Sequence, residues 1–458
     1  MQQIVVIGSG LSGTLFTINI LRHHHHSPIS ITVIDKNPPG TLGLAYSTDH
    51  SFHLLNVPAF KMSAFPDNSN DFTDWLSKAG YPYDPHSFVP RKVYREYILS
   101  LLQNELSRKK ENIHYTYIND SAIDIVPQKR LLLLGSGRQV PFHKLVLAVG
   151  NFNPAPLRLP DNDYLRHPAY FSSAWDNHLA NQHSPWEHVL IIGTGLTMVD
   201  TVLTLQRSSP DVLITALSNH GYMPLSHERT AGYQLEDKPH HDISTLSEAL
   251  QIVNKHIKKS REQKIGWQAV VDAIRPYTQE VWHNFSYREK KKFLGRLRHI
   301  WGVARHRMPP ECAEQIHRLL LRQQLFIAAG QIQSINLNAS NGFDVFYHEK
   351  STRRNVQLTT NAIINCMGPE CNYENLDDPL IKNLLQRGLI RSDELRLGLD
   401  CSPGGIIIEK NGAPSPFLFT LGPPVKGILW EITSVPEIRV AALQLAKLVA
   451  GKKVESIA

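Results

Sequence analysis

Three glycines close to the amino terminus stand at a spacing that can hold a phosphate group. Gly8, Gly10 and Gly13 follow the apolar run 4–7, which is typical of a strand buried on both faces. The first glycine permits a tight turn, the second lets a ligand approach the backbone, and the third lets a helix pack closely. The amino terminus of that helix offers free N–H groups to a pyrophosphate. The pattern predicts a dinucleotide-binding turn, although a purely structural glycine turn has the same spacing.

Asp35 supports the dinucleotide interpretation. A second strand is expected over 29–34, and Asp35 at its end follows Gly13 by 22 residues. An acid at about this distance, roughly 20 residues, can accept a hydrogen bond from a ribose hydroxyl. The strand, the turn, a helix expected over 14–22 and the acid together form the context that the glycine pattern requires.

A second glycine turn begins 185 residues after the first. Gly193 and Gly195 follow another apolar strand, but Met198 occupies the place of the third glycine. The next strand, expected over 212–217, is followed by Ser218, which offers neither an acid for a ribose nor an arginine for a 2′-phosphate. The pattern predicts a nicotinamide-nucleotide site, and it also fits a degenerate repeat with a structural role.

The segment 225–325 differs from the rest of the chain because it is helical and charged, and we interpret it as an insertion that covers the active site. Its cluster Arg305-His306-Arg307 stands where a helix must end. The cluster could bind a phosphate or an anionic substrate, although a solvated helix end fits as well. His227, Arg305 and His306 are the candidate catalytic residues, as handlers of substrate charge or of protons.

Two further stretches have spacings that suggest a ligand. The loop 36–67 is long and rich in Pro, Gly and Asn, and such a loop after a nucleotide-binding strand is usually functional, unless it is a packed connector. Ser434 and Glu437 have capping-box spacing, which predicts the start of a helix whose amino terminus stabilises negative charge. Arg91 near the start of another expected helix is unfavourably placed for a cation, which a nearby anion would explain.

The composition limits the class of protein. The chain has 458 residues and a net charge of +7, concentrated over 255–310, and no nucleic-acid motif accompanies it, so we expect no nucleic-acid partner. The four cysteines form no C-x-x-C pair, and neither cysteine nor acid accompanies the histidine run 23–26, so we expect no metal. We expect a cytoplasmic protein without a signal peptide or a membrane span. Nothing in the sequence indicates an oligomeric state.

Taken together, these features resemble the flavoproteins with two dinucleotide-binding domains. Within that group, the chain is similar to a bacterial FAD/NAD(P)-binding family related to the flavin monooxygenases that hydroxylate amines or insert oxygen beside ketones. The motifs that carry the resemblance extend over nearly the whole chain: G-S-G-L-S-G, G-L-A-Y-S-T, H-L-L-N-V-P-A-F-K-M-S-A-F-P-D, F-V-P-R-K-V-Y, G-T-G-L-T-M-V-D, R-H-R-M-P and L-W-E-I-T-S-V-P-E-I-R.

The resemblance implies an α/β fold with two Rossmann-like domains. The expected FAD-binding domain is discontinuous, over 1–160 and 340–458, and the NAD(P)-binding-like domain covers 185–340 with the helical insertion 225–325. Eight residues are implied to lie at or near FAD: Gly8, Gly10, Gly13, Asp35, His53, Asn56, Gly422 and Thr433.

The resemblance also implies an FAD-dependent oxidoreductase that accepts hydride from NAD(P)H and oxygenates a small organic substrate. Three departures matter. Pro423 follows Gly422 where disulfide reductases carry an acid, and their redox cysteines are missing, which removes that chemistry. Asn219-His220 replaces the arginine pair with which relatives often hold a 2′-phosphate, so NADPH and NADH both stay open. Two alternatives are a flavin oxidase or dehydrogenase with a structural second domain, and a regulatory protein that senses flavin or a nucleotide.

Overall fold

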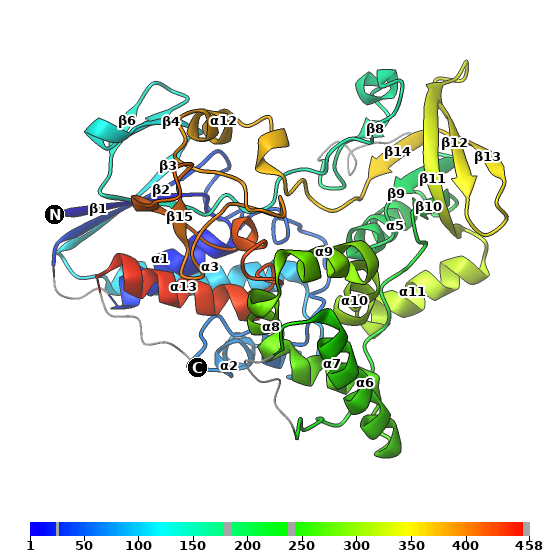
Figure 1. Ribbon diagram of the computed structural model, residues 1–458, viewed down its shortest axis with the longest axis horizontal. Coiled ribbons are helices and arrows are strands. Elements are labelled where there is room, and N and C mark those ends of the chain that lie inside the picture. Colours follow the sequence, from blue (N-terminus) through cyan, green and yellow to red (C-terminus); the bar gives the residue numbers. More distant parts are fainter. Residues whose placement is uncertain (24–26, 177–185, 237–242, 452–458) are drawn as a thin grey trace.

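The computed structural model describes residues 1–23, 27–176, 186–236 and 243–451. Two main sheets lie on opposite sides of the molecule, and a group of helices lies between and below them in Figure 1. Of the histidine run 23–26, residues 24–26 lie outside the described residues. Within the described part, no helix combines the length and the apolar character needed to cross a membrane.

The first sheet has six strands in the order β15-β16-β7-β1-β2-β3. All neighbouring pairs are parallel except β15 and β16. Its middle is buried on both faces, because helices cover one face and a small three-stranded sheet with α12 covers the other. The strands are β1 Gln2–Ile7, β2 Ile29–Asp35, β3 Ile113–Asn119, β7 Lys144–Leu147, β15 Ile406–Ile408 and β16 Pro414–Thr420. The covering elements are α1 Leu11–His23, α2 Asp71–Lys78, α3 Arg91–Arg108, α13 Val435–Val449, β4 Ala122–Val126, β5 Leu131–Leu134, β6 Gln139–Pro141 and α12 Pro379–Gln386.

The second sheet has seven strands in the order β13-β12-β11-β10-β9-β14-β8. The strands from β8 to β11 pair in parallel, and β12 and β13 extend the sheet as an antiparallel meander. The strands are β8 Tyr170–Phe171, β9 His188–Ile192, β10 Leu213–Ser218, β11 Leu325–Leu337, β12 Phe343–Glu349, β13 Asn355–Thr360 and β14 Ala362–Asn365; α5 Leu196–Ser208 and α11 Pro310–Leu321 cover one face. Both sheets are mainly parallel with strand–helix–strand connections, so the α/β fold with two Rossmann-like units is confirmed.

The return of the chain to the first sheet comes later than predicted. The sequence analysis expects the first domain to resume at residue 340, but β12, β13 and β14 hydrogen-bond within the second sheet. The chain re-enters the first sheet only at β15. The alternating pattern of β12 and β13 indicates strands but not the sheet that they join, because strand pairing depends on tertiary contacts. The domain limits themselves stay a prediction.

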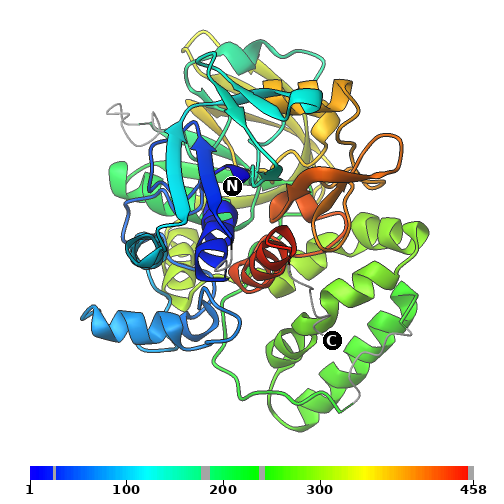
Figure 2. The same cartoon turned by 90° about the vertical axis from the view of Figure 1, so that its left-hand side faces the viewer.

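The charged insertion forms a compact helical layer. It comprises α6 Leu246–Glu262, α7 Trp267–Ile274, α8 Thr278–Asn284, α9 Tyr287–Arg296 and α10 Arg298–Arg305, all between β10 and β11. Figure 2 shows this layer, in green, beside the red helix α13. The insertion therefore packs against the carboxy-terminal part of the first unit, although it interrupts the second.

Candidate functional site: two nucleotide-binding turns

The first glycine turn is closely packed at Gly8 and Gly13 and open at Gly10, the middle glycine. Gly8 has φ +102°, and a Cβ there would lie 2.3 Å from the carbonyl oxygen of Ala148. A Cβ on Gly13 would lie 2.0 Å from the carbonyl oxygen of Gly8. A Cβ on Gly10 would meet nothing nearer than 3.8 Å. The turn thus leaves room at the position where a pyrophosphate approaches the backbone, so these residues fit a dinucleotide such as FAD.

Asp35 lies at the mouth of this turn. Its Oδ2 accepts hydrogen bonds from the backbone N–H and the hydroxyl of Ser9, at 2.7 and 2.9 Å. Its Oδ1 accepts from the backbone N–H of Asn37 at 2.8 Å. The carboxylate is held beside the glycine backbone and is only partly buried, which suits a group that accepts a hydrogen bond from a ribose.

The second turn repeats the hydrogen bonds of the first. Gly8 donates to the last residue but one of β2, and Gly193 donates to Leu217, the last but one of β10, both at 2.8 Å. A Cβ on Gly193 would lie 2.6 Å from the carbonyl oxygen of Cys366, just after β14. Gly195 has open space around its Cα, with nothing within 4 Å of an added Cβ. The two turns are therefore equivalent, and both are open at the middle glycine.

The second turn differs from the first in charge. Ser218 stands where Asp35 stands in the first turn, and the Thr194 and Ser218 hydroxyl oxygens lie 2.9 Å apart, as the Ser9 and Asp35 side chains do. The carboxylate is thus replaced by a hydroxyl. Met198, at the place of the third glycine, is fully buried.

The segment that leads into α13 begins with a turn at Gly422, which packs against the start of α1. Gly422 has φ +77°, and a Cβ there would lie 2.3 Å from the hydroxyl oxygen of Ser12, in the first turn of α1. The helix begins at Val435 directly after Ser434, as predicted, but the expected capping box is absent. The side chains of Ser434 and Glu437 instead bind Arg275, with Nη2 of the arginine 2.8 Å from the Ser434 hydroxyl oxygen.

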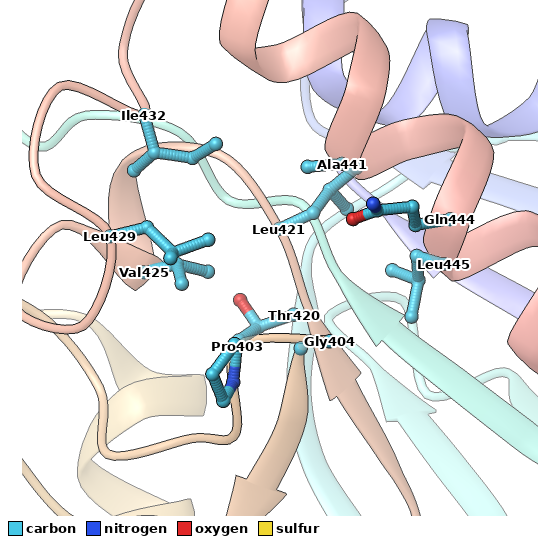
Figure 3. Close-up of a pocket in the computed structure, with 11 residues that line it drawn as sticks. Pro403, Gly404, Thr420, Leu421, Val425, Leu429, Ile432, Ala441, Gln444 and Leu445 are labelled. Carbon is cyan, nitrogen blue, oxygen red and sulfur yellow. The ribbon is translucent and has the colours of Figure 1, made fainter. Parts of the chain in front are cut away.

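A small cavity lies behind this segment. Figure 3 shows Leu429, Val425 and Ile432 facing Leu421 across it. The cavity has room for no more than about one water molecule. It is a packing gap, too small for a substrate.

The two loop residues implied to lie near the cofactor contact other parts of the protein. The ring nitrogens of His53 lie 2.7 Å from the Thr48 hydroxyl and 3.0 Å from the Thr204 hydroxyl of α5. Burial, with the charges of Arg91 and a second histidine, lowers the pKa of His53 to about 3. The backbone carbonyl of Asn56 lies 2.9 Å from Nε2 of the insertion residue His227. The loop is therefore fixed to both the second sheet and the insertion.

The anion that the position of Arg91 suggests is a side chain of the protein. Its guanidinium lies 2.7 Å from the carboxylate of Asp200 in α5, and both side chains are mostly buried. Burial raises the pKa of Asp200, and the Arg91 charge opposes this rise. The pair joins α3 of the first unit to the helix that follows the second glycine turn.

The candidate catalytic residues have different surroundings. Burial and the charge of Arg307 lower the pKa of His227 to about 4, so its imidazole is neutral at pH 7. Arg305 is buried in an ion pair with Glu431, so its charge is already neutralised. His306 is solvent-exposed, and the protein around it lowers its pKa.

The cationic cluster around residue 306 is therefore largely paired within the protein. Arg307 binds the amide oxygen of Gln268 at 2.5 Å and the carboxylate of Asp272, which Lys61 of the loop also contacts at 3.0 Å. Sequence reasoning missed these acids, because nothing near Asp272 or Glu431 in the sequence indicates a distant arginine. No group of three metal-ligating side chains occurs in the described part of the chain.

Comparisons with known proteins agree with this geometry. Residues 5–152 match a family model described as FAD-NAD(P)-binding. No curated protein sequence matches the chain. Three solved structures cover 98–99% of the chain at 14% identity: the FAD-bound cadaverine monooxygenase of Erwinia amylovora (TM-score 0.63, 96% of that chain), an ornithine N-hydroxylase of Kutzneria with FAD, NADP⁺ and L-ornithine (0.62, 99%), and the ornithine hydroxylase of Pseudomonas aeruginosa (0.64, 99%).

The matched family segment includes the whole first glycine turn and β7, against which Gly8 packs. The solved structures match both units, the insertion and the carboxy-terminal return, because they cover nearly the full chain. Residues 5–152 thus match a family model described as FAD-NAD(P)-binding, and the chain has, over nearly its whole length, the fold of the N-hydroxylating flavin monooxygenases.

Proposed function

We propose that the protein is an FAD-dependent monooxygenase that takes hydride from a nicotinamide nucleotide and oxygenates a small organic substrate. The observation that carries this proposal is the pair of equivalent glycine turns, at Gly8 and Gly193, with the same backbone hydrogen bonds. A flavin and a hydride donor require two such sites. FAD, when bound, supplies the hydride acceptor and the oxygen chemistry, and the chain binds, orients and shields the reactants.

The substrates named for the similar structures suggest where to begin. Cadaverine and ornithine are small primary amines. Primary amines are therefore the first substrates to test for this protein.

We further propose NADPH as the preferred donor. Ser218 replaces the acid that would repel a 2′-phosphate, and just beyond it lies a group of basic side chains. The ring of His220 is 5.5 Å from that of Tyr222 and 4.5 Å from that of His299 in α10. Nη2 of Arg298 lies 3.3 Å from Nε2 of His299.

This basic group carries charge that the protein leaves unneutralised. Burial and the charges of Arg298, His220 and Lys350 lower the pKa of His299. Among the described residues, no carboxylate forms an ion pair with Arg298 or Lys350, whereas Arg305 has Glu431. Unpaired cations at the end of the second strand of a nucleotide-binding unit suit a 2′-phosphate. In this proposal, Arg298 of the insertion and Lys350 take the role of the arginine pair that is missing from the strand end.

The test begins with the absorbance spectrum of the protein loaded with FAD, followed by anaerobic mixing with NADPH or NADH. We expect NADPH to bleach the flavin without substrate, and oxygen to be consumed with hydroxylamine formation when an accepted amine is added. Bleaching by a metabolite alone would favour the oxidase or dehydrogenase alternative. FAD binding without turnover by any donor would favour the regulatory alternative, and no FAD binding would refute the proposal.

The donor proposal has its own variants. Arg298→Gln and Lys350→Gln should each raise the NADPH concentration for half-maximal reduction rate about tenfold, the usual effect of losing one charge-assisted hydrogen bond. The same variants should leave reduction by NADH unchanged. Arg296→Gln, an exposed arginine at the end of α9, is the matched control. Equal losses with both donors would contradict 2′-phosphate recognition by this group.

A further inference from the structure

The short segment 427–434 leads from the Gly422 turn into α13, and its backbone is held in an unusual shape. Glu431 has φ +69°, in the left-handed region that residues other than glycine rarely adopt. Such a conformation persists only where the surroundings enforce it, and it is found often at functional sites. The side chain of Glu431 is only 3% exposed. The structure must therefore supply contacts that hold this residue in place.

The contacts that hold Glu431 come from the insertion. Its Oε2 accepts a hydrogen bond from Nε of Arg305 at 2.9 Å, and its Oε1 accepts one from Nε1 of Trp301 at 2.5 Å. Both donors lie in α10. Each carboxylate oxygen is thus engaged by a separate side chain, which fixes the orientation of the carboxylate as well as its position.

Two further residues of the insertion, Trp282 and Arg275, contact this segment or the first turn of α13. Nε1 of Trp282 donates to the carbonyl oxygen of Gly427 at 2.9 Å, and its ring stacks on Trp430 with centroids 4.8 Å apart. Arg275 makes a two-point ion pair with Glu437 in the first turn of α13, at 2.6 and 2.7 Å. Burial would raise the pKa of Glu437, but the hydrogen bonds and charge of Arg275 outweigh it and lower that pKa. The insertion therefore holds the segment at its start, its middle and its end.

We infer that Arg305 and Trp301 are positioning residues for the flavin: by fixing Glu431, they set the path of the chain into α13 and thereby the direction in which the N–H groups at the start of that helix point. This inference rests on the proposed function, because it needs FAD at the first turn. Helix N–H groups stabilise an anion only when they point at it, and their effect falls off within one turn. Free movement of segment 427–434 would thus weaken the interaction between α13 and the flavin ring.

The inference changes the role expected for the insertion. A lid opens and closes, but these helices are held to segment 427–434 and to the first turn of α13 by buried ion pairs and two indole hydrogen bonds. On this inference, the helices of the insertion form part of the wall of the flavin site.

The test is a set of four variants made in the full chain: Arg305→Met, Glu431→Ala, Glu431→Gly and the double variant Arg305→Met/Glu431→Gly. The measurements are the FAD dissociation constant of the FAD-free protein, the visible circular dichroism and midpoint potential of the bound flavin, and the thermal unfolding of the FAD-free protein. Arg296→Met, at an exposed arginine at the end of α9, is the control.

We expect Arg305→Met to raise the FAD dissociation constant about tenfold or more, as the loss of a charge-assisted hydrogen bond would, and to change the flavin circular dichroism. Glu431→Gly should weaken FAD binding less than Glu431→Ala, because glycine adopts the left-handed backbone without strain. In the Glu431→Gly background, Arg305→Met should add nothing further, since its partner is already absent. That double variant also carries no unpaired buried charge, so it provides a result even if Arg305→Met unfolds.

Two results would overturn the inference. One is an FAD dissociation constant and flavin spectrum of Arg305→Met within twofold of the unchanged protein. The other is a full additional loss of FAD affinity when Arg305→Met is added to Glu431→Gly. Failure of the unsubstituted protein to bind FAD would instead refute the proposed function, and the inference with it.

Discussion

The ion pair between Arg91 and Asp200 should be the most sensitive polar contact between the two nucleotide-binding units. The two side chains are 13% and 10% exposed, and their charged atoms are 2.7 Å apart. The substitution Arg91→Met keeps the length of the side chain and removes its charge. It leaves the Asp200 carboxylate buried without its partner. Removing one member of a buried ion pair typically costs about 3–5 kcal/mol.

The cost should depend on pH in a direction that the structure fixes. Burial already raises the pKa of Asp200, and Arg91 opposes the rise. In Arg91→Met the pKa rises further, so the folded state retains a proton that the unfolded state releases. The free energy of unfolding of the variant should then fall by about 1.4 kcal/mol for each pH unit between the ordinary pKa of an aspartate, which the unfolded state has, and the raised pKa of the folded state, and should level off above it. The deficit is thus smallest near pH 5 and larger at pH 8.

Urea unfolding of the FAD-free protein between pH 5 and pH 8 measures this cost. The double variant Arg91→Met/Asp200→Leu should recover most of the loss, because a buried pair replaced by apolar groups is often neutral. Asp49→Asn is the matched control, since Asp49 pairs with Arg95 of the same helix but is 86% exposed, and it should cost less than about 1 kcal/mol. A loss in Arg91→Met below about 1 kcal/mol and independent of pH would refute the reasoning.

Three further predictions concern single positions. Gly13→Ala should destabilise the FAD-free protein by about 1–3 kcal/mol, since its Cβ would lie 2.0 Å from the Gly8 carbonyl oxygen, whereas Gly10→Ala should leave thermal unfolding unchanged and weaken FAD binding in a fluorescence titration. The folded pKa of His227, about 4, is below its ordinary value of 6.5, so its stabilisation is complete above pH 6.5 and is lost as the pH falls towards 4. His227→Gln should therefore reduce the pH slope of the unfolding free energy in that range by about 1.4 kcal/mol per unit; an unchanged slope would assign the proton uptake elsewhere. Trp282→Phe keeps the stacked ring, loses the hydrogen bond to segment 427–434 and should cost about 1 kcal/mol in urea unfolding.

The local features of the site could be predicted from the sequence because their physics is local. A glycine turn between an apolar strand and a helix needs only neighbouring residues, so Gly8, Gly10 and Gly193 indicate turns that the structure contains. The start of α13 is equally local, and it begins where the spacing of Ser434 predicts. The prediction of a capping box was wrong because of a tertiary contact. Its Ser and Glu side chains bind Arg275, more than 150 residues away in the sequence.

Ion-pair partners could not be predicted, and they change the interpretation of several candidates. A cation near a helix start, such as Arg91, indicates an anion nearby but does not distinguish a ligand from Asp200. The same ambiguity applies to Arg305 and Glu431. Charge in the sequence is informative about a ligand only where the fold leaves it unpaired. By that criterion Arg298 remains a candidate for ligand binding in this structure.

The contacts of the loop 36–67 bear on how the two glycine turns are placed relative to each other. His53 bridges to Thr204 of α5, and Arg91, at the start of α3, binds Asp200 one turn earlier in α5. Helix α5 begins at the second glycine turn, so its position sets where a donor nucleotide binds. The loop follows the strand that ends at Asp35, so its position helps to set where FAD binds. A single buried interface thus fixes the two glycine turns relative to each other. In the proposed function, hydride transfer needs its two partners at a defined separation, and this interface would help to hold the two turns at one.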